Sequence, residues 1–212
     1  FPYTTLFRSH LFASFEKDFE LENFEISEMK LNIESVTNDT FLNVFKNNLI
    51  ESSVKPGSTG SLKNSIDFIL DKKNSDFSSG IRMYETLSGS ESDRYEYNFP
   101  YYNFSKNFFS NLFEGSFNFS STGANVLNNT NILKSTINNN LSYSSLDYFT
   151  NLGLQNNYNF YFKNLNTVAK NHSIYKSSPQ SHFMSLFETI TSFPLEKKSE
   201  NFEENIVPKM SF

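Results

Sequence analysis

The histidines are the first candidates for metal-binding or catalytic residues, because imidazole both binds metals and transfers protons. The chain has three of them, His10, His172 and His182, and it has no cysteine. A zinc site normally gathers several His, Cys or carboxylate ligands at close spacing, and none cluster here. The absence of Cys also excludes disulfides and thiolate metal sites within this chain. We therefore expect no metal-binding residues and interpret the histidines as ordinary strand or loop residues.

Carboxylates are the other candidates for acid–base chemistry. A first group alternates with Phe15, Lys17, Phe19 and Leu21, which predicts one solvated face of a strand; its members are Glu16, Asp18, Glu20 and Glu22. A second group could supply the two carboxylates of a glycosidase, but the sequence spacing does not indicate which two would pair. Its members are Glu51, Asp67, Glu85 and Glu96.

Motifs for nucleophilic or phosphoryl chemistry are absent from the sequence. There is no GxSxG elbow and no Gly-rich phosphate loop. The net charge is −5, and Lys and Arg do not cluster, so we expect no nucleic-acid partner. We predict that the protein is not an enzyme, with no catalytic residues, no cofactor-binding residues and no cofactor.

The composition is unusual, with 25 Phe and 11 Tyr but no Trp and only 7 Gly among 212 residues. No apolar run approaches the ~18 residues that a membrane-spanning helix needs. Strands of a membrane barrel need only ~9–11 residues and give a weaker signal, so a barrel remains compatible with this sequence.

Alternation with a period of two residues dominates the chain. In Phe113–Ser120, Phe113, Phe117 and Phe119 share one face with a glycine, while Glu, Ser and Asn occupy the other. A helix would instead place apolar residues three and four positions apart. Three polar residues interrupt the otherwise apolar stripes, namely Asn64, Ser135 and Asn139. This pattern predicts half-buried strands.

We predict about ten strands from the alternation and the turn residues between them. They cover His10–Glu22, Ser27–Val36, Ser61–Leu70, Phe77–Leu87, Arg94–Ser105, Leu112–Ser121, Asn131–Tyr143, Asp147–Phe162, Ser181–Phe193 and Asn205–Phe212. Several are longer than the usual ~5–6 residues of globular proteins. The expected fold class is all-β: an antiparallel up-and-down meander that forms an open part of a large transmembrane outer-membrane β-barrel.

The connections between these strands are expected to alternate in length. Short ones are predicted at Asn23–Ile26, Asp71–Asp76, Lys106–Asn111 and Ser144–Leu146. Long ones are predicted at Asn38–Gly60, Thr122–Thr130 and Asn164–Gln180, whereas Ser88–Asp93 and Pro194–Glu204 fit the alternation poorly. Short turns at one end and long loops at the other are typical of outer-membrane barrels.

The first nine residues, Phe1–Ser9 (FPYTTLFRS), resemble the in-frame translation of a sequencing-adapter oligonucleotide. A segment of this kind is excluded from fold reasoning. We therefore expect residues 1–9 to be an artefact and residues 10–212 to be a partial barrel domain of a longer protein.

In Leu31–Phe45 (LNIESVTNDTFLNVF) a strand pattern ends in Ser/Thr and an Asp/Asn pair before a loop. This stretch resembles a strand of the outer-membrane LPS-assembly family LptD (OstA), and other stretches do so as well. Asp93–Ser105 (DRYEYNFPYYNFS) is similar to a strand that contains a Pro and leads to an aromatic-rich partner. Tyr175–Leu195 and Ile206–Phe212 resemble a strand, a "PL" turn, and a strand that starts with Pro and a basic residue. These stretches keep the family's order over nearly all of His10–Phe212.

The resemblance implies a function in transport. Members of the family assemble lipopolysaccharide into the outer leaflet of the outer membrane of Gram-negative bacteria. The implied partners are LPS, a lumen-plugging outer-membrane lipoprotein, outer-membrane lipid, and a periplasmic bridge protein that acts through an N-terminal jellyroll domain. This chain would be an internal run of barrel wall, and the family offers no catalytic residues to transfer.

Two other classes of protein are compatible with the pattern. Another outer-membrane barrel, such as a porin or a receptor, would share the alternation and the loop arrangement. A soluble extracellular β-rich adhesin or binding module would show shorter strands, a drier core and more turn Gly and Pro.

Overall fold

The computed structural model describes residues 9–47, 54–90, 93–129, 131–198 and 203–212, and most of these residues are in strands. One short helix, α1 (Phe41–Phe45), follows the second strand. The strands are β1 (His10–Asp18), β2 (Ile26–Val36), β3 (Ser61–Lys72), β4 (Ser75–Thr86), β5 (Tyr95–Ser110), β6 (Gly115–Asn128), β7 (Ile132–Ser145), β8 (Tyr148–Phe149), β9 (Gln155–Lys170), β10 (Gln180–Ser192), β11 (Leu195–Lys198), β12 (Glu203–Ile206) and β13 (Lys209–Ser211).

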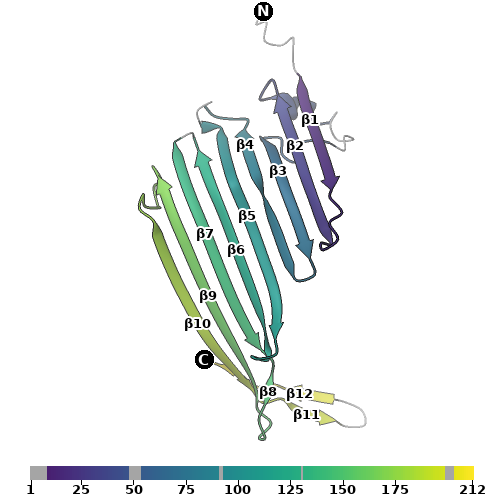
Figure 1. Cartoon of the computed structure of the whole chain (residues 1–212), viewed down its shortest axis with the longest axis vertical. Coiled ribbons are helices and arrows are strands. Elements are labelled where there is room, and N and C mark those ends of the chain that lie inside the picture. Colours follow the sequence, from purple (N-terminus) through teal and green to yellow (C-terminus); the bar gives the residue numbers. More distant parts are fainter. Residues whose placement is uncertain (1–8, 48–53, 91–92, 130, 199–202) are drawn as a thin grey trace, which may run out of the picture.

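Eleven of these strands form one antiparallel up-and-down sheet (Figure 1). Its order is β1-β2-β3-β4-β5-β6-β7-β9-β10-β13, and β8 pairs with β9. The sheet is open, because β1 does not pair with β10 or β13. The predicted fold class, an open all-β antiparallel meander, is confirmed. Up to β10, each strand of this order lies beside the next long strand in sequence, and the exceptions are β8, which pairs only with β9, and the separate hairpin of β11 and β12.

Several details of the predicted strands and connections are wrong. Strand β9 continues to Lys170, into the predicted connection Asn164–Gln180, and β11 lies within the predicted connection Pro194–Glu204. The first predicted strand ends at Asp18, so Glu20 and Glu22 belong to the following turn, where Glu20 has a φ of 52°. The predicted strand Asp147–Phe162 is divided into β8 and β9 by a turn at 150–154, where the Thr150 N–H bonds to the Leu154 carbonyl. The last predicted strand corresponds to β12 and β13, and Pro208 lies between them.

The predicted alternation of short and long connections holds only in part. The connection at 37–60 is long and the one at 73–74 is short, as expected. The connection at 129–131 is short, because β6 continues to Asn128 and β7 starts at Ile132. The connection at 146–154 is longer than predicted and contains β8. Connection length alone therefore does not separate the two ends of this sheet.

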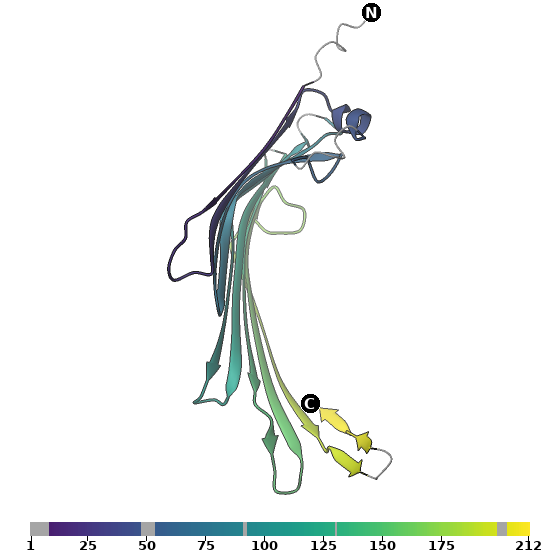
Figure 2. The same cartoon turned by 90° about the vertical axis from the view of Figure 1, so that its right-hand side faces the viewer.

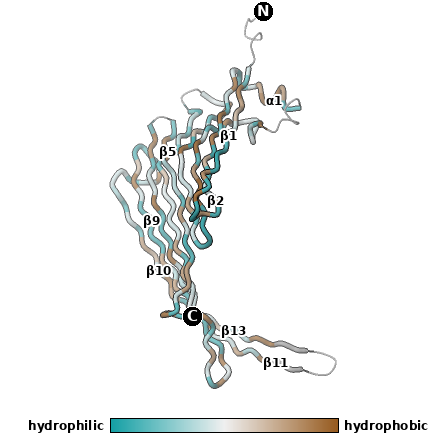
Figure 3. Tube along the Cα trace, turned by 45° about the vertical axis from the view of Figure 1, so that its right-hand side comes forward, coloured by the Kyte–Doolittle hydropathy of each residue, from teal (hydrophilic) through white to brown (hydrophobic). Residues whose placement is uncertain are grey.

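The pairing register divides the side chains into two faces of opposite character. The apolar face is defined by Leu31, Ile66, Ile81, Phe119 and Phe160 and by residues at two-residue spacing from them. The polar face is the opposite one, defined by Lys30, Asp67, Arg82, Asn118 and Asn159. Because paired residues lie on the same side of a sheet, the alternation seen along each strand is preserved across strands. Figure 3 shows the alternating hydropathy along the tube.

The described residues provide no second layer of structure over most of the apolar face. Large apolar side chains of this face are exposed, for example Phe183 at 69% and Phe187 at 60%. The buried core is a small cluster at one end of the sheet, formed by Phe41, Leu42, Leu62 and Leu87. A sheet normally buries its hydrophobic face against another layer, so the exposed apolar face is the unusual feature of this fold. No helix among the described residues is long and apolar enough to cross a membrane.

The sheet is bent along its length, and α1 and the β11–β12 hairpin lie on the inner side of the bend (Figure 2). Helix α1 packs against Phe12 and Val36, which belong to the polar face by register. The ring of His10, also on that face, lies 4.8 Å from the ring of Phe41. The same cluster contains Leu62 and Leu87, which lie at two-residue spacing from Ile66 and Ile81 of the apolar face. Helix α1 therefore contacts both faces at this end of the sheet, beyond the point where β2 and β3 stop pairing.

We expect Gly80→Ala to destabilise the sheet by about 1–3 kcal/mol, because a larger residue is forced into a closely packed position. A Cβ atom at Gly80 would lie 2.2 Å from the Ile66 carbonyl oxygen, so the β3–β4 pair must shift. Urea titration in detergent, followed by circular dichroism, measures the change in the free energy of unfolding.

The matched control is Gly57→Ala, since a Cβ atom at Gly57 meets nothing within 4 Å. Its expected effect is within about 0.5 kcal/mol, as for most surface substitutions. Equal effects of the two substitutions would contradict the close packing at Gly80.

Candidate functional site

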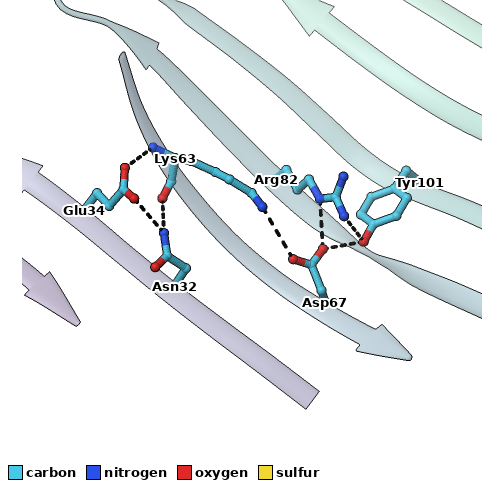
Figure 4. A network of polar contacts seen from close by, with 6 residues as sticks. All are labelled: Asn32, Glu34, Lys63, Asp67, Arg82 and Tyr101. Carbon is cyan, nitrogen blue, oxygen red and sulfur yellow. Dashed lines mark hydrogen bonds and ion pairs between the residues drawn. The ribbon is translucent and has the colours of Figure 1, made fainter. Parts of the chain in front are cut away.

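The main concentration of charge on the polar face is a cluster that joins β3, β4 and β5 (Figure 4). Asp67 on β3 accepts a hydrogen bond of 2.9 Å from Arg82 Nε on β4. Tyr101 on β5 donates its hydroxyl proton to the same carboxylate, and Arg82 Nη2 lies 2.7 Å from the Tyr101 hydroxyl. The guanidinium carbon also lies 4.0 Å from the centre of the Tyr101 ring, which adds a cation–π contact. Asp67 and Tyr101 are both buried.

A glycine and a β-bulge make this cluster possible. Gly80 is the register partner of both Asp67 and Tyr101, so no side chain stands between the carboxylate and the phenol. The register of β4 against β5 shifts between Gly80 and Arg82, and the register of β5 against β6 shifts beside Pro100. A proline has no N–H for the ladder, so it is tolerated at a bulge. The bulge lets Arg82 reach the Tyr101 hydroxyl.

Side chains continue this cluster toward β2, where the backbone ladder stops. The β2–β3 register ends at Asn32, and beyond it Glu34 accepts a 2.6 Å hydrogen bond from the Lys63 N–H. Asn32 donates to the Lys63 carbonyl at 2.7 Å, and Asn64 exchanges two hydrogen bonds with the backbone of Glu34. These side chains replace the backbone pairing. They provide hydrogen-bond partners for backbone N–H and C=O groups that would otherwise have none.

The charges of the cluster are mutually compensated. Lys63 Nζ lies 3.9 Å from Asp67 Oδ2, so Asp67 faces two cations. A separate ion pair ties the 87–94 connection to the 37–60 connection, since Arg94 contacts Asp39 at 2.5 Å and Glu85 at 3.4 Å. The hydrogen bond to Asp39 raises the pKa of Arg94 above its ordinary value. Within the described residues no group of His or carboxylates is arranged to hold a metal ion.

An aromatic row crosses the apolar face toward the opposite end of the sheet. It contains one register-paired residue from each of five neighbouring strands, namely Phe108, Phe117, Tyr143, Phe160 and Phe187. The rings of Phe108 and Phe117 stack at 5.1 Å, and those of Phe117 and Tyr143 lie 4.8 Å apart. Contacts of this kind stabilise sheets through cross-strand pairs.

An amide row crosses the same face farther along the strands. Ser121 donates to Asn139, Asn139 donates to Asn164, and Asn164 donates to Ser181, with separations of 2.7, 3.1 and 3.1 Å. The hydroxyl of Tyr102 lies 3.1 Å from that of Ser121. Asn139, which interrupts the apolar stripe in the sequence, therefore has polar partners on both neighbouring strands. The apolar face has a polar border here.

The residues considered for chemistry in the sequence lie apart in the structure. His10 stacks on Phe41, whereas His172 accepts hydrogen bonds from the N–H groups of Ile174 and Tyr175 in the loop at 171–179. His182 lies on β10.

The candidate carboxylates likewise have separate settings. Asp67 is paired with Arg82, Glu85 accepts a hydrogen bond from Tyr95, and Glu96 faces Tyr84 across the β4–β5 pair. Glu51 lies outside the described residues. The cluster of Asp67, Arg82 and Tyr101 was not predicted. The sequence feature that could have predicted it is the short connection at 73–74. Once this turn is recognised, it fixes the β3–β4 register.

No protein-family model matches the chain, and no curated protein sequence is significantly similar to it. The resemblance to the LPS-assembly family therefore stays a prediction that rests on the sequence stretches quoted above.

We expect Arg82→Leu to destabilise the sheet by about 2–4 kcal/mol, because it leaves the buried Asp67 carboxylate without its main cation. Adding Asp67→Asn to that variant removes the uncompensated charge and is expected to recover part of the loss. Urea titration of the single and double variants measures the coupling between the two residues.

Lys30→Leu is the matched control on the same face. Lys30 bridges Glu16 and Glu28, but its side chain is 45% exposed, so the expected loss is below about 1 kcal/mol. A loss at Arg82 no larger than this would show that the cluster contributes little to stability.

Proposed function

We propose that this chain forms part of the wall of an outer-membrane β-barrel that takes part in LPS assembly. The observation that carries the membrane part is the uncovered apolar face of a one-layer antiparallel sheet. Such a sheet bonds its backbone groups between neighbouring strands, which is the requirement for a structure inside a bilayer. Its two faces then meet two different surroundings, lipid on one side and a wet lumen on the other.

The polar face supports this orientation. It carries the charged cluster of Asp67, Arg82 and Lys63, in which the charges are paired with one another. Paired charges of this kind suit a wet lumen better than a lipid surrounding. The aromatic row at Phe117 and its neighbours supports the outward orientation of the other face, because aromatic girdles mark membrane interfaces.

The open edges of the sheet agree with a partial wall. Strand β1 pairs only with β2, and β10 pairs with β13 over three residues, Ile190–Ser192. Unpaired edges promote aggregation, and barrels remove them by closure. The proposal therefore assigns the pairing of these edges to strands beyond the described sheet.

The LPS-assembly part rests on the sequence resemblance. Under this proposal LPS is the transported substrate, a lipoprotein occupies the lumen, and a periplasmic bridge protein delivers LPS through an N-terminal domain. The charged and amide side chains of the polar face would meet the lipoprotein or the sugar part of LPS. The location is the outer membrane of a Gram-negative bacterium.

A porin or a receptor barrel is the second candidate, because the two-faced sheet supports any outer-membrane barrel equally. A soluble adhesin or binding module is less well supported. Burying the exposed side chains of Phe183 and Phe187 would require a second layer, which the described residues do not supply.

Single-cysteine labelling tests the membrane orientation, and the cysteine-free chain makes each introduced residue unique. Phe119 and Leu141 are register partners on the apolar face, whereas Ser120 and Asn140 are partners on the polar face. In bilayer vesicles, an environment-sensitive fluorophore at Phe119→Cys or Leu141→Cys should be quenched by brominated lipid.

The matched labels at Ser120→Cys and Asn140→Cys should be quenched by aqueous iodide instead, because adjacent residues alternate between the faces. All four positions are half-buried, so exposure does not distinguish them. The absence of lipid quenching at all four positions would contradict the membrane proposal.

Depletion of the gene product in the source cells distinguishes the two kinds of barrel. For an LPS-assembly protein, the amount of LPS labelled at the cell surface should fall before growth stops, because newly made LPS no longer reaches the outer leaflet. Surface LPS is measured with a membrane-impermeant probe. Normal surface LPS together with reduced uptake of small solutes would favour a porin or a receptor.

A further inference from the structure

We propose that the apolar face carries a binding groove for an amphipathic membrane lipid with a neutral sugar headgroup. This inference rests on the membrane orientation proposed above, but not on the LPS-assembly assignment. Its basis is the juxtaposition of two hollows on that face, one lined mainly by apolar side chains and the other lined in part by amides and hydroxyls. Each is described in turn.

The first hollow, the apolar groove, has a volume of about 530 Å³ and lies over β2 to β7. Its apolar lining comes from Leu31, Ile66, Ile81, Met83, Leu127 and Leu133. Phe99, which is 63% exposed, adds a wall beside the bulge in β5. Small-molecule sites typically have volumes of about 300–1,000 Å³ and a predominantly apolar lining. The groove has the size and character that suit an acyl or alkyl chain.

The second hollow, the amide groove, has a volume of about 340 Å³ and lies over β5 to β10. Asn125, Ser135, Asn166 and Ser181 supply amide and hydroxyl groups to its lining. Tyr102 lies across Gly123, where a Cβ atom would meet the tyrosine ring at 2.1 Å. Glycine therefore allows an aromatic surface to lie close to the backbone there. Amides beside an aromatic ring suit the hydroxyls and the apolar patches of a sugar ring.

Asn125 lines both grooves, so the two hollows adjoin each other on one face. Phe99 lines the apolar groove and the next residue, Pro100, lines the amide groove. In the same way Leu133 lines the apolar groove and Ser135 the amide groove. An apolar groove that adjoins a polar one matches a ligand that is itself apolar at one end and polar at the other. Among the described residues no side chain or backbone group hydrogen-bonds to the side chains of Asn125 and Ser135, so both are available to a ligand.

The charges around the grooves select a neutral headgroup. Among the described residues, neither lining contains a lysine or a carboxylate. Arg82 contributes to the apolar groove, but its guanidinium is already bonded to Asp67 and Tyr101. A phosphate would be desolvated without a cation to compensate it, whereas sugar hydroxyls need only amide and hydroxyl partners. The complementarity therefore favours a neutral glycolipid over a phospholipid.

Photolabelling of the full chain in phosphatidylcholine vesicles tests the inference. The probe is a dodecyl maltoside that carries a diazirine in its alkyl chain, used below its micellar concentration. Labelled positions are mapped by mass spectrometry. Labels are expected to concentrate in the peptides of the apolar groove that contain Leu31, Leu127 and Leu133. An excess of unlabelled dodecyl maltoside should suppress this labelling. The same concentration of dodecylphosphocholine should not, because it has no sugar headgroup.

Asn125→Leu is the decisive variant, and Asn138→Leu is its matched control on the opposite face. Both asparagines are half-buried, and they lie on neighbouring strands, β6 and β7. Loss of the hydrogen bonds from Asn125 should lower groove labelling about fivefold, in line with the usual net value of a hydrogen bond. Asn138→Leu should leave labelling unchanged. Infrared spectra establish that both variants keep their strand content.

Uniform labelling along the apolar face, or equal competition by both detergents, would overturn the inference. So would an equal loss of labelling in the two variants. Vesicle flotation is measured on the same samples and reports membrane insertion separately. A chain that does not float contradicts the membrane proposal. The groove is then tested by labelling that chain in solution, where labels in the same peptides and suppression by dodecyl maltoside alone would support it.

Discussion

The structure depends on one constraint, which is that a single layer of strands must satisfy its backbone while leaving one apolar face uncovered. The ladder from β1 to β10 satisfies the backbone, because each strand bonds to its sequence neighbours. Among the described residues the apolar face is covered only at one end, where Leu62 and Leu87 pack with Phe41 and Leu42 of α1. In water this arrangement exposes rings such as Phe187, so the free energy that a core normally supplies must come from outside the sheet. A bilayer provides such a surrounding.

The polar face shows a different way of stabilising the sheet. Asp67, Arg82 and Tyr101 connect three strands at the point where a bulge shifts the register. Farther along, Glu34 and Asn64 bridge the place where β2 and β3 stop pairing. Buried charges are costly unless they are paired and hydrogen-bonded, so these interactions specify the local geometry more than they add stability. Their position on the polar face is compatible with a wet lumen, where the exposed charges stay solvated.

The apolar face is not uniform, and its variation bears on function. The aromatic row around Phe117 and the amide row around Asn139 lie at different heights along the same strands. A membrane-facing surface with such a border separates a region suited to acyl chains from a region suited to headgroups. The adjoining grooves near Asn125 lie where apolar and amide linings meet. The proposed barrel wall and the proposed glycolipid groove thus follow from the same division of residues.

The sequence by itself determined the strands and their two-faced character, because a period of two residues is a local property of the chain. The predicted strand at Ser61–Leu70 and the turn after it match β3 and its connection to β4 closely. Only the tertiary structure decided what depends on pairing across strands. The bulge beside Pro100 brings Arg82 to Tyr101, and the extension of β6 to Asn128 shortens a connection that was expected to be long. Register and bulges arise from contacts between distant residues, so no single strand records them.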